Sequence, residues 1–430
     1  MNARLQLFPE WEPDTLGQFA LLVPGKTPSK GEYSSSGDIK MIKFRDVMES
    51  GRVDFSNDDG GWLDSSKVDR SDLVDLVPDT ILLTNAAHSS SHLGKKIGFV
   101  EALPEGVRAC FVGELTSIRA KAPEDNGRWL FYLLQTPQLR REIIKAAEGA
   151  HLVPFWLKKI PFRKPPPEVR NRVAEKMKAV DDFISSIEEH IRKAERVAVA
   201  LDQAHFAAGP NHVRFPYEYG MTRTIPHGWA SKRLGKIADI TSGITLNQDR
   251  EAADNGVRYL TVVNVYRGRI DLTEVRYLES RGNEAESKRL NRNDILVVEG
   301  HANPEEIGRA ALVTEREAGM SFQNHLFRVR LENEDEVRAR FLVRALNSPR
   351  VRRHWVATAN TSSGLSTINR TALRRLIVPL PEPREQDWII ERLDAAEAQV
   401  AALKQQLAAT RRLKTALLQN LLIERNRVTL

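Results

Sequence analysis

The stretch Val173-Ala-Glu-Lys-Met177-Lys-Ala-Val180-Asp-Asp-Phe-Ile184-Ser-Ser-Ile187-Glu-Glu-His-Ile191 decides the fold. Its apolar residues are separated alternately by four and three positions, and the same alternation continues to Leu201. This is the heptad pattern of a helix that buries one narrow seam against another helix. Charged residues fill the positions between, as expected for a solvated face. The sequence therefore predicts a helix of about four heptads that needs a helical partner.

A second heptad series near the end of the chain supplies that partner. It begins after Pro383 with the same alternation and then changes its spacing. Its members are Ile389, Leu393, Ala396, Val400, Leu403, Leu407 and Thr410, followed by Leu413, Leu417 and Leu421. We expect an antiparallel coiled coil whose interface contains Val173, Met177, Val180, Ile184, Ile187, Ile191, Leu393, Val400, Leu403 and Leu407. The alternatives are that each helix packs on its own lobe, or that the helices join two copies of the chain.

The chain also repeats itself once. Five segments of the first half resemble five segments of the second half, and they follow one another in the same order. The pairs are residues 39–47 and 257–265, 51–54 and 268–271, 79–83 and 293–297, 134–137 and 346–349, and 160–165 and 376–381. Because one coincidence means little but five ordered matches do not arise by chance, we infer two copies of one module.

Each copy shows the pattern of a mixed α/β lobe. Short β-branched and aromatic strands are separated by Gly, Asn and Asp turns, and a helix follows at about residues 128–147 or 336–357. A proline-rich stop then precedes each long helix, since proline cannot continue a strand or sit inside a helix. The predicted class is α+β, with two similar α/β lobes separated by two long helices packed as an antiparallel coiled coil. The expected boundaries are 1–164 for the first lobe, 165–208 for the first helix, 209–380 for the second lobe and 381–430 for the second helix.

Composition limits the classes of function. The 430 residues are 41% hydrophobic and 28% charged, which is typical of globular domains with their own cores. Lys and Arg number 64 against 57 Asp and Glu, and the net charge of +7 is compatible with nucleic-acid binding but does not require it. The single cysteine, Cys110, excludes a disulfide framework and a cysteine-based zinc site, and we expect it to be a small buried residue. No signal peptide or membrane-spanning segment is predicted, so a cytoplasmic location is expected.

Sequence signatures of catalysis are missing. Gly25-Lys-Thr27 resembles the end of a phosphate-binding loop, but Ala20 stands where that loop needs its first glycine, and Pro28 follows. Asp294 and Glu299 only faintly resemble a nuclease carboxylate pair, because the usual lysine is absent. No dinucleotide-binding, hydrolase, metalloprotease or amino-methyltransferase motif occurs. We therefore expect no catalytic residues and no metal site.

Four segments carry a family resemblance. They are residues 225–243, 291–297, 363–365 and 376–386, the last of which reads Leu-Ile-Val-Pro-Leu-Pro-Glu-Pro-Arg-Glu-Gln. In this order they resemble a target recognition domain of the specificity subunits of type I restriction–modification systems. The resemblance is clear from Ile225 onward and weaker from Leu16 to Leu201. There, His151-Leu-Val-Pro replaces a loop of small residues, and no Glu-Gln follows Pro167.

The resemblance implies a DNA sequence-specificity subunit without chemistry of its own. In that family, each of two target recognition domains reads one half of a split site in double-stranded DNA, and the two long helices fix the gap between the halves. The subunit binds two methyltransferase subunits, which bring S-adenosylmethionine, and restriction subunits with motor and nuclease activity can join. No cofactor is expected on this chain itself.

Contacts with bases and phosphates need exposed donors, acceptors and cations, which in a small α/β lobe come from loops and strand ends. The candidate DNA-binding residues of the first lobe are Lys26, Lys30, Thr84, Asn85, His88, Ser89, Lys95, Lys96 and His151. Those of the second lobe are Thr245, Asn247, His301, Asn303, Thr361, Ser362 and Ser363. An ordinary solvated connection is the alternative for these loops. The arginines between Arg338 and Arg353 are either a phosphate-facing patch or an ion-paired helix face.

Two other functions stay open on the sequence alone. One is a stand-alone nuclease or methyltransferase whose motifs have diverged beyond recognition. The other is a coiled-coil scaffold subunit of another phage-defence assembly, which holds protein partners and touches no nucleic acid.

Overall fold

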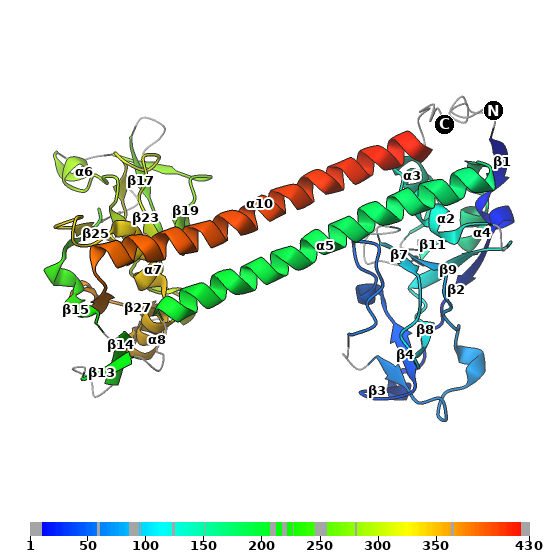
Figure 1. Ribbon diagram of the computed structural model, residues 1–430, viewed down its shortest axis with the longest axis horizontal. Coiled ribbons are helices and arrows are strands. Elements are labelled where there is room, and N and C mark those ends of the chain that lie inside the picture. The colour runs from blue at the N-terminus through cyan, green and yellow to red at the C-terminus, as the bar shows by residue number, and fades with distance from the viewer. Residues whose placement is uncertain are drawn as a thin grey trace. The chain divides into compact units, whose positions relative to one another are not determined.

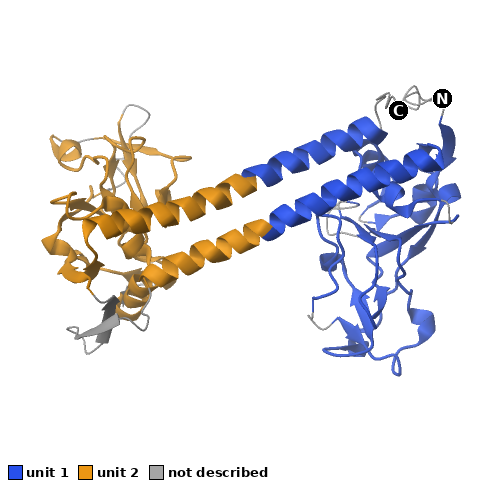
Figure 2. Ribbon diagram, in the orientation of Figure 1, with its two compact units in different colours: residues 1–189, 405–430 blue, residues 190–404 orange. Residues whose placement is uncertain are grey.

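The computed structural model describes residues 11–57, 61–85, 94, 96–122, 125–149, 151–206, 212–216, 222–226, 228–245, 256–279, 282–362 and 365–422. The chain forms two compact units, which Figure 2 shows in blue and orange. Unit 1 consists of residues 1–189 and 405–430, and unit 2 consists of residues 190–404. Each unit therefore combines one lobe with one end of each long helix.

Unit 1 is built on two four-stranded sheets (Figure 1). The first is antiparallel with the order β2-β9-β6-β7, and the second has the order β3-β5-β4-β8 with β4 and β8 parallel. The strands are β2 (Ala20–Pro24), β3 (Tyr33–Ser34), β4 (Ile39–Ile42), β5 (Trp62–Leu63), β6 (Thr80–Thr84), β7 (Ile97–Val100), β8 (Arg108–Phe111) and β9 (Leu115–Ala120). Because β4, β6 and β7 are buried along their whole length, their sequences are largely apolar rather than alternating.

Unit 2 repeats this arrangement. Its antiparallel sheet has the order β16-β25-β21-β23, and in a second sheet β17 pairs with β24 in parallel and with β20 antiparallel. The strands are β16 (Ala238–Ser242), β17 (Val257–Leu260), β20 (Arg276–Leu278), β21 (Ile295–Val298), β23 (Ala310–Leu312), β24 (Ser321–Phe322) and β25 (Leu326–Leu331). The order along the chain and across each antiparallel sheet is the same in both units, which confirms the predicted duplication.

Unusual backbone conformations recur at matching places. Asp79 and Asn293, just before β6 and β21, have φ of 56° and 68°. Gly51 and Gly268, in the repeated Gly-Arg turn, have φ of 89° and 76°. Residues other than glycine, aspartate and asparagine rarely adopt such angles. The matched turns explain why these residue types were retained in both copies.

The helices expected at residues 128–147 and 336–357 are each split in two. Unit 1 has α2 (Gly127–Leu134) and α3 (Pro137–Lys145), and unit 2 has α7 (Ala339–Asn347) and α8 (Pro349–Thr358). The break falls before Pro137 and Pro349, because proline fits the first turn of a helix but not its interior. Thr136 and Ser348 cap the second helix of each pair by accepting a backbone N–H of its first turn.

The long helices are α5 (Pro167–Phe206) and α10 (Pro383–Leu422), with 40 residues each (Figure 1). Both begin at a proline, Pro167 and Pro383, at the end of the proline-rich segment that precedes each helix. Three ion pairs join the helices, Asp181–Lys414 (2.7 Å), Glu188–Arg411 (2.8 Å) and Glu195–Lys404 (2.8 Å). Residue numbers rise along one helix as they fall along the other, so the helices pack antiparallel, and the predicted fold class is confirmed. In the described part of the chain, no helix is long and apolar enough to cross a membrane.

Most of the predicted seam is covered. Val173, Met177, Ile184, Ile187, Ile191 and Leu393 are buried, and Val180, Val400, Leu403 and Leu407 are half-buried. The predicted change of spacing at Leu413 is wrong, because Leu413 is 55% exposed. The heptad pattern instead continues from Thr410 through Lys414 to Leu417. A search for apolar residues misses this continuation, because a lysine occupies one of the seam positions.

The ends of the long helices complete the cores of the lobes. In unit 1, Met177 of α5 and Leu418 of α10 belong to the same core as Trp129. In unit 2, Ile389 of α10 and Phe206 of α5 belong to one core. The alternative that a helix packs on its own lobe therefore holds for the first turns of each helix, whereas the central turns pair helix with helix.

Candidate nucleic-acid interface

In unit 1, two of the predicted loops leave the same edge of the antiparallel sheet. Strands β2 and β6 flank β9 and are both antiparallel to it, so they run in the same direction and end at the same edge of the sheet. The loop after β2 begins at Gly25, whose N–H donates to the carbonyl of Leu115 (2.8 Å), and the loop after β6 begins at Asn85, whose N–H donates to the carbonyl of Glu114 (2.9 Å). We call this end of the sheet the loop edge.

Unit 2 has the same loop edge. Ser242 at the end of β16 and Val298 at the end of β21 pair with the adjacent residues Phe327 and Leu326 of β25. Gly243 here corresponds to Gly25 in unit 1. A Cβ atom would lie 2.2 Å from a backbone oxygen at Gly25 and 2.1 Å from one at Gly243, so only glycine lets the chain turn so close to the neighbouring strand.

A hairpin lies beside the loop after β6 or β21 in each unit. In unit 1 it consists of β10 (Ala147–Glu148) and β11 (His151–Leu152), and Leu152 N–H donates to the carbonyl of Asn85 (2.7 Å). In unit 2, β26 (Asn360–Ser362) and β27 (Leu365–Thr367) form the hairpin, and β27 pairs with β22 (Gly300–His301). The structure thus brings together the loops and hairpins that the sequence singled out separately.

Thr84 and Asn85 do not belong among residues that contact a ligand. The Thr84 side chain is fully buried and its hydroxyl donates to the carbonyl of Lys96 (2.6 Å). Asn85 is 9% exposed, and its amide donates to the hydroxyl of Thr116 (2.9 Å). Both side chains therefore hold the base of the loop edge and are removed from the proposed DNA-binding set.

The remaining described candidates of unit 1 are accessible. Lys26 and Lys30 are exposed in the loop after β2, and the ammonium of Lys26 donates to the carbonyl of Ser71. Lys96 is half-buried at the start of β7, and His151 is exposed on β11. These four side chains place positive charge or donors around one edge, as contact with phosphates requires.

In unit 2, His301 and Asn303 are partly engaged with their own loop. Nδ1 of His301 accepts the N–H of Asn303 (3.0 Å), and the side chain of Asn303 accepts the N–H of Glu305 (3.0 Å) as the cap of a short 3-10 helix. Thr245 is exposed just after the loop edge. Asn303 therefore has a structural role, while His301 presents its other ring nitrogen.

Several predicted residues cannot be placed. His88, Ser89, Lys95, Asn247 and Ser363 lie outside the described residues. The backbone of Thr361 and Ser362 forms β26, but their side chains also lie outside what the structure describes. Their role in DNA binding stays a prediction.

The sequence analysis missed a set of cations that lie over aromatic rings. In unit 1, ammonium groups lie 4.4–5.0 Å from ring centroids in the pairs Lys40–Trp62, Lys43–Tyr33 and Lys96–Phe44. In unit 2, the guanidinium groups of Arg269 and Arg309 lie 4.2 and 5.5 Å from the ring of Tyr266. The sequence carries little signal for them, because Trp62 and Tyr33 are distant in the sequence from Lys40 and Lys43. Such pairs fix a cation without neutralising it, which suits contact with a phosphate backbone.

At one equivalent place in the two units, a cation lies across a strand pair from an aromatic residue. Lys40 of β4 lies directly across from Trp62 of β5, and Arg258 of β17 lies directly across from Tyr277 of β20. Lys40 is buried, and its ammonium donates to the carbonyl of Asn57, whereas Arg258 is exposed. A cation facing an aromatic residue on this strand pair is thus common to both units, although only unit 2 leaves the cation open to solvent.

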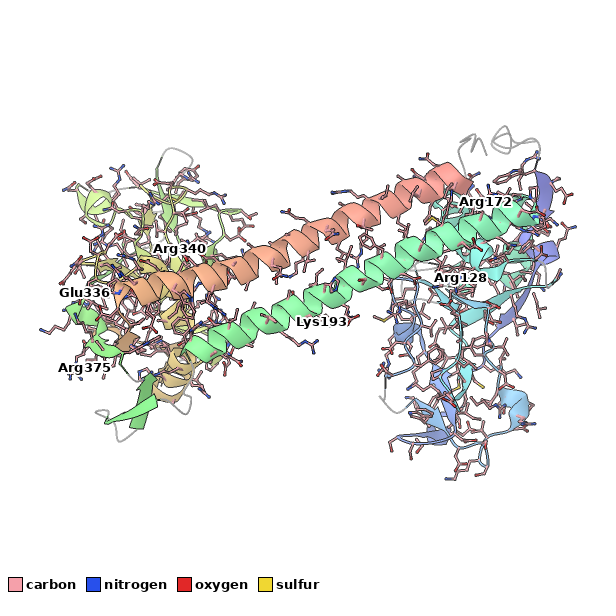
Figure 3. The ribbon with its side chains drawn as sticks, viewed as in Figure 1. Arg128, Arg172, Lys193, Glu336, Arg340 and Arg375 are labelled. Carbon is pink, nitrogen blue, oxygen red and sulfur yellow. The ribbon has the colours of Figure 1, made fainter. Side chains whose placement is uncertain are left out.

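The arginines at the start of α7 and within it follow the ion-paired alternative. Arg338 forms two hydrogen bonds with the carboxylate of Asp387 (2.8 and 3.1 Å), and Arg344 contacts Asp394 and Glu397 (3.0 and 2.8 Å). Arg340, labelled in Figure 3 beside α10, lies 2.5 Å from Asp394. These arginines attach α7 to α10, so we do not assign them to phosphate contact.

A cleft of about 920 Å³ in unit 2 lies beside these ion pairs. Its charged lining is mixed, with Arg267, Arg269, Arg292, Arg316, Arg340 and Arg344 facing Asp202, Glu315, Glu317, Asp394 and Glu397. Burial raises the pKa of Asp202, an effect that Arg344 opposes and Glu397 strengthens. Because the charges nearly balance, the cleft offers no general attraction for an anion.

The carboxylates considered for catalysis are engaged in structural contacts. Both oxygens of Asp294 accept hydrogen bonds from Arg330 (2.7 Å each), and Glu299 pairs with His325 (2.9 Å). The described residues contain no group of three or more His, Cys, Asp or Glu side chains arranged to hold a metal ion. Cys110 is buried, and burial followed by its hydrogen bond to Asp75 raises the pKa of the thiol to about 12, as expected for a packing residue.

Comparison with known proteins agrees with this arrangement. Residues 226–410 match the family model of the type I restriction modification DNA specificity domain. The specificity subunit of the type I restriction enzyme StySPI of Salmonella potsdam is 23% identical over 363 residues, which cover 80% of this chain and 76% of that protein. The EcoKI specificity subunit of Escherichia coli K12 is 20% identical over 365 residues, again 80% of this chain and 76% of that protein.

Solved structures share the fold over the whole chain. The HsdS subunit of Thermoanaerobacter tengcongensis matches with a TM-score of 0.54 at 17% identity, covering 98% of both chains. A chain from a structural study of assembly and conformational transition in a type I R-M system matches with a TM-score of 0.59 at 17% identity, covering 97% of this chain and 98% of that one.

Two repeated α+β units with matching loop edges, each containing one end of a pair of antiparallel helices, define a duplicated fold. The family match covers residues 226–410, which include the second lobe and α10 as far as Thr410, and unit 1 repeats the sheet order of unit 2. Over most of its length the chain is similar to specificity subunits of type I restriction–modification systems, and residues 226–410 match the DNA specificity domain of that family.

Proposed function

We propose that this chain is the non-catalytic DNA-reading subunit of a type I restriction–modification complex. Each unit would read one half of a bipartite site in double-stranded DNA through its loop edge, and the paired helices would fix the spacing and bind two methyltransferase subunits. The observation that carries the proposal is the duplicated loop edge, with the same loops and hairpin gathered in each unit. Two similar DNA-binding units suit a site with two halves, as in other proteins that bind half-sites.

The reaction belongs, in this proposal, to the partners. S-adenosylmethionine would be held by the methyltransferase subunits, and restriction subunits would join for cleavage. The relatives carry names of specificity subunits of restriction enzymes, which supports this division of labour. The complex would act in the cytoplasm, where genomic DNA is accessible.

Exchange of one lobe tests the proposal. Residues 16–160 are replaced by the corresponding lobe of a specificity subunit with a different target, and methylated positions are mapped across the genome of cells that contain the complex. We expect one half of the methylated motif to change and the other half and the gap to stay. The reciprocal exchange of residues 230–380 should change the other half, and a motif that changes in both halves after either exchange contradicts the proposal.

The two alternatives give different results in the same experiments. A scaffold without DNA contact predicts that the assembled complex binds DNA equally well whichever lobe it carries. A diverged nuclease or methyltransferase predicts that the purified chain cleaves or methylates DNA without any partner.

A further inference from the structure

The two long helices come from one duplicated module, yet they carry opposite charges at two matching positions. Counted from Pro167 and Pro383, Glu188 of α5 corresponds to Lys404 of α10, and Glu195 corresponds to Arg411. In the antiparallel pair these residues meet crosswise. Oε1 of Glu188 lies 2.8 Å from Nη2 of Arg411, and Oε1 of Glu195 lies 2.8 Å from Nζ of Lys404.

A homotypic pair, either α5 with α5 or α10 with α10, would contain neither of these attractive contacts. If α5 of one chain packed with α5 of a second copy in this register, Glu188 of each copy would face Glu195 of the other. If α10 packed with α10, Lys404 would face Arg411 twice. Like charges beside the seam disfavour pairing and opposite charges favour it, which is how coiled coils choose partner and orientation.

The apolar seam cannot make this choice. Both helices cover residues at the same heptad positions, and the matched pairs include Met177 with Leu393, Val180 with Ala396 and Ile184 with Val400. A duplicated chain therefore offers each helix a competitor of similar shape in every other copy. Only a feature in which the two helices differ can exclude that competitor.

We propose that Glu188, Glu195, Lys404 and Arg411 select the pairing of α5 with α10 and reject the pairing of either helix with the same helix of a second copy. The surface fits the opposite helix of the repeat, because only that pairing makes both facing contacts attractive. These side chains are 23–58% exposed, so each contact changes an equilibrium only about threefold. A homotypic pair contains two repulsive contacts in place of two attractive ones, so the effects accumulate.

A double charge reversal separates the two pairings. The variant with Glu195→Lys and Lys404→Glu keeps both contacts within the chain attractive, because one ion pair is only reversed. It also makes the facing contacts attractive in both homotypic arrangements. We expect an unfolding midpoint close to that of the unmodified chain, together with a dimer whose dissociation constant in analytical ultracentrifugation is at least about tenfold lower.

A fourfold variant is the matched control. Reversal of all four residues, Glu188→Arg, Glu195→Lys, Lys404→Glu and Arg411→Glu, keeps the pairing within the chain attractive and the homotypic contacts repulsive, so it should sediment like the unmodified chain. Added salt should weaken the dimer of the double variant, since these charges are exposed. The proposal is overturned if the double variant sediments like the unmodified chain at every concentration, or if the fourfold variant dimerises as strongly as the double one. Neither readout involves DNA, so the result is independent of the proposed function.

Discussion

Oδ1 of Asp181 in α5 lies 2.7 Å from Nζ of Lys414 in α10, and the hydroxyl of Tyr132 in α2 donates a 2.8 Å hydrogen bond to the other oxygen of the same carboxylate. Three segments that are distant in the sequence thus meet at one carboxylate in unit 1. The Tyr132 side chain is fully buried, and Lys414 and Asp181 are 13% and 25% exposed, so water screens these contacts weakly. Burial and the nearby Asp181 carboxylate raise the pKa of the Tyr132 hydroxyl, which keeps it a donor.

Replacing Lys414 by methionine should therefore destabilise unit 1. The Asp181 carboxylate would keep only the Tyr132 hydroxyl, and we expect the free energy of unfolding to fall by about 1–3 kcal/mol in urea titrations. Lys178→Met is the control, because Lys178 pairs with Asp182 (2.7 Å) on the exposed side of α5 and should change stability little. Equal losses of unfolding free energy in the two variants would show that the Asp181–Lys414 contact contributes no more than an exposed ion pair.

Gln386 is expected to be just as important for unit 2. Its side chain is fully buried, accepts the N–H of Arg338 (2.8 Å) and donates to the carbonyls of Glu336 and Pro381 (2.9 Å each). Gln386→Leu leaves these three backbone groups without that partner, and should lower the free energy of unfolding by about 2–4 kcal/mol. The same change at the exposed Gln405 of α10 should have almost no effect in the same measurement. If Gln386→Leu is equally harmless, this amide does not hold α10 against the lobe.

The Glu385-Gln386 motif predicts where α10 begins but not what its glutamine contacts. The motif marked the start of α10, but it did not reveal that Gln386 binds three backbone groups. At the matching position of α5 the residue is Arg170, which is 2% exposed and lies 2.9 Å from Asp125. The first unit therefore attaches its helix with an ion pair instead of an amide. Sequence comparison recorded only a departure from the motif, because the partner Asp125 is not adjacent in the sequence.

A sequence reveals heptad spacing well, but it does not reveal which polar side chains are buried or paired. The seam from Val173 to Ile191 predicted a paired helix correctly, since heptad spacing is a local property. Thr84 was assigned to DNA contact because polar residues after a strand usually face solvent, but the backbone of Lys96 covers it. The sequence does not decide between the two alternatives for Arg344, because its partners Asp394 and Glu397 follow some fifty positions later along the chain. These outcomes depend on tertiary contacts that no short window contains.

Asp202 should make the stability of unit 2 depend on pH. Burial raises its pKa in the folded state above the unfolded value, so the folded state binds the proton more tightly. Its contribution to stability is complete below the unfolded pKa and is lost as the pH rises through the folded pKa. Asp202→Asn should therefore gain stability relative to the unmodified chain as the pH is raised from about 4 to 7, as measured by thermal unfolding.

Asp387 provides a control of opposite sign for Asp202. The guanidinium of Arg338 lowers the pKa of Asp387, so its contribution is present above the unfolded pKa and is lost as the pH falls through the folded pKa. Asp387→Asn should lose stability at neutral pH and approach the unmodified chain in acid. Parallel pH profiles for the two variants would contradict the assignment of these shifts.

Lengthening both long helices tests their proposed role in spacing. Seven residues are inserted after Glu189 in α5 and another seven after Lys404 in α10, so that the seam and its antiparallel partner stay in register. The pair becomes about 10 Å longer, which corresponds to the rise of roughly three base pairs. We expect the methylated motif to keep both half-sequences and to gain a longer gap. A change in either half-sequence, with the gap unaltered, would contradict the spacing role.

The lysines that lie over aromatic rings should contribute to DNA affinity rather than to sequence choice. The ammonium groups of Lys43 and Lys96 in unit 1 lie over the rings of Tyr33 and Phe44, and a phosphate contact made by each would release counterions from DNA. Replacing either lysine by alanine should weaken binding of the assembled complex to target and non-target DNA alike. The slope of log affinity against log salt should become shallower by about one for each lysine removed.

Two further variants make the result for these lysines decisive. Lys145→Ala in α3 removes a lysine already paired with Glu142 (2.7 Å), and should leave both affinity and salt slope unchanged. Lys96→Arg keeps the cation over the ring and should retain most of the affinity. If Lys43→Ala and Lys96→Ala bind like the unmodified complex at every salt concentration, the DNA does not pass over this part of unit 1, and the interface must lie in the loops alone. If binding weakens for the target only, these lysines take part in reading bases, because phosphate contacts cannot distinguish one sequence from another.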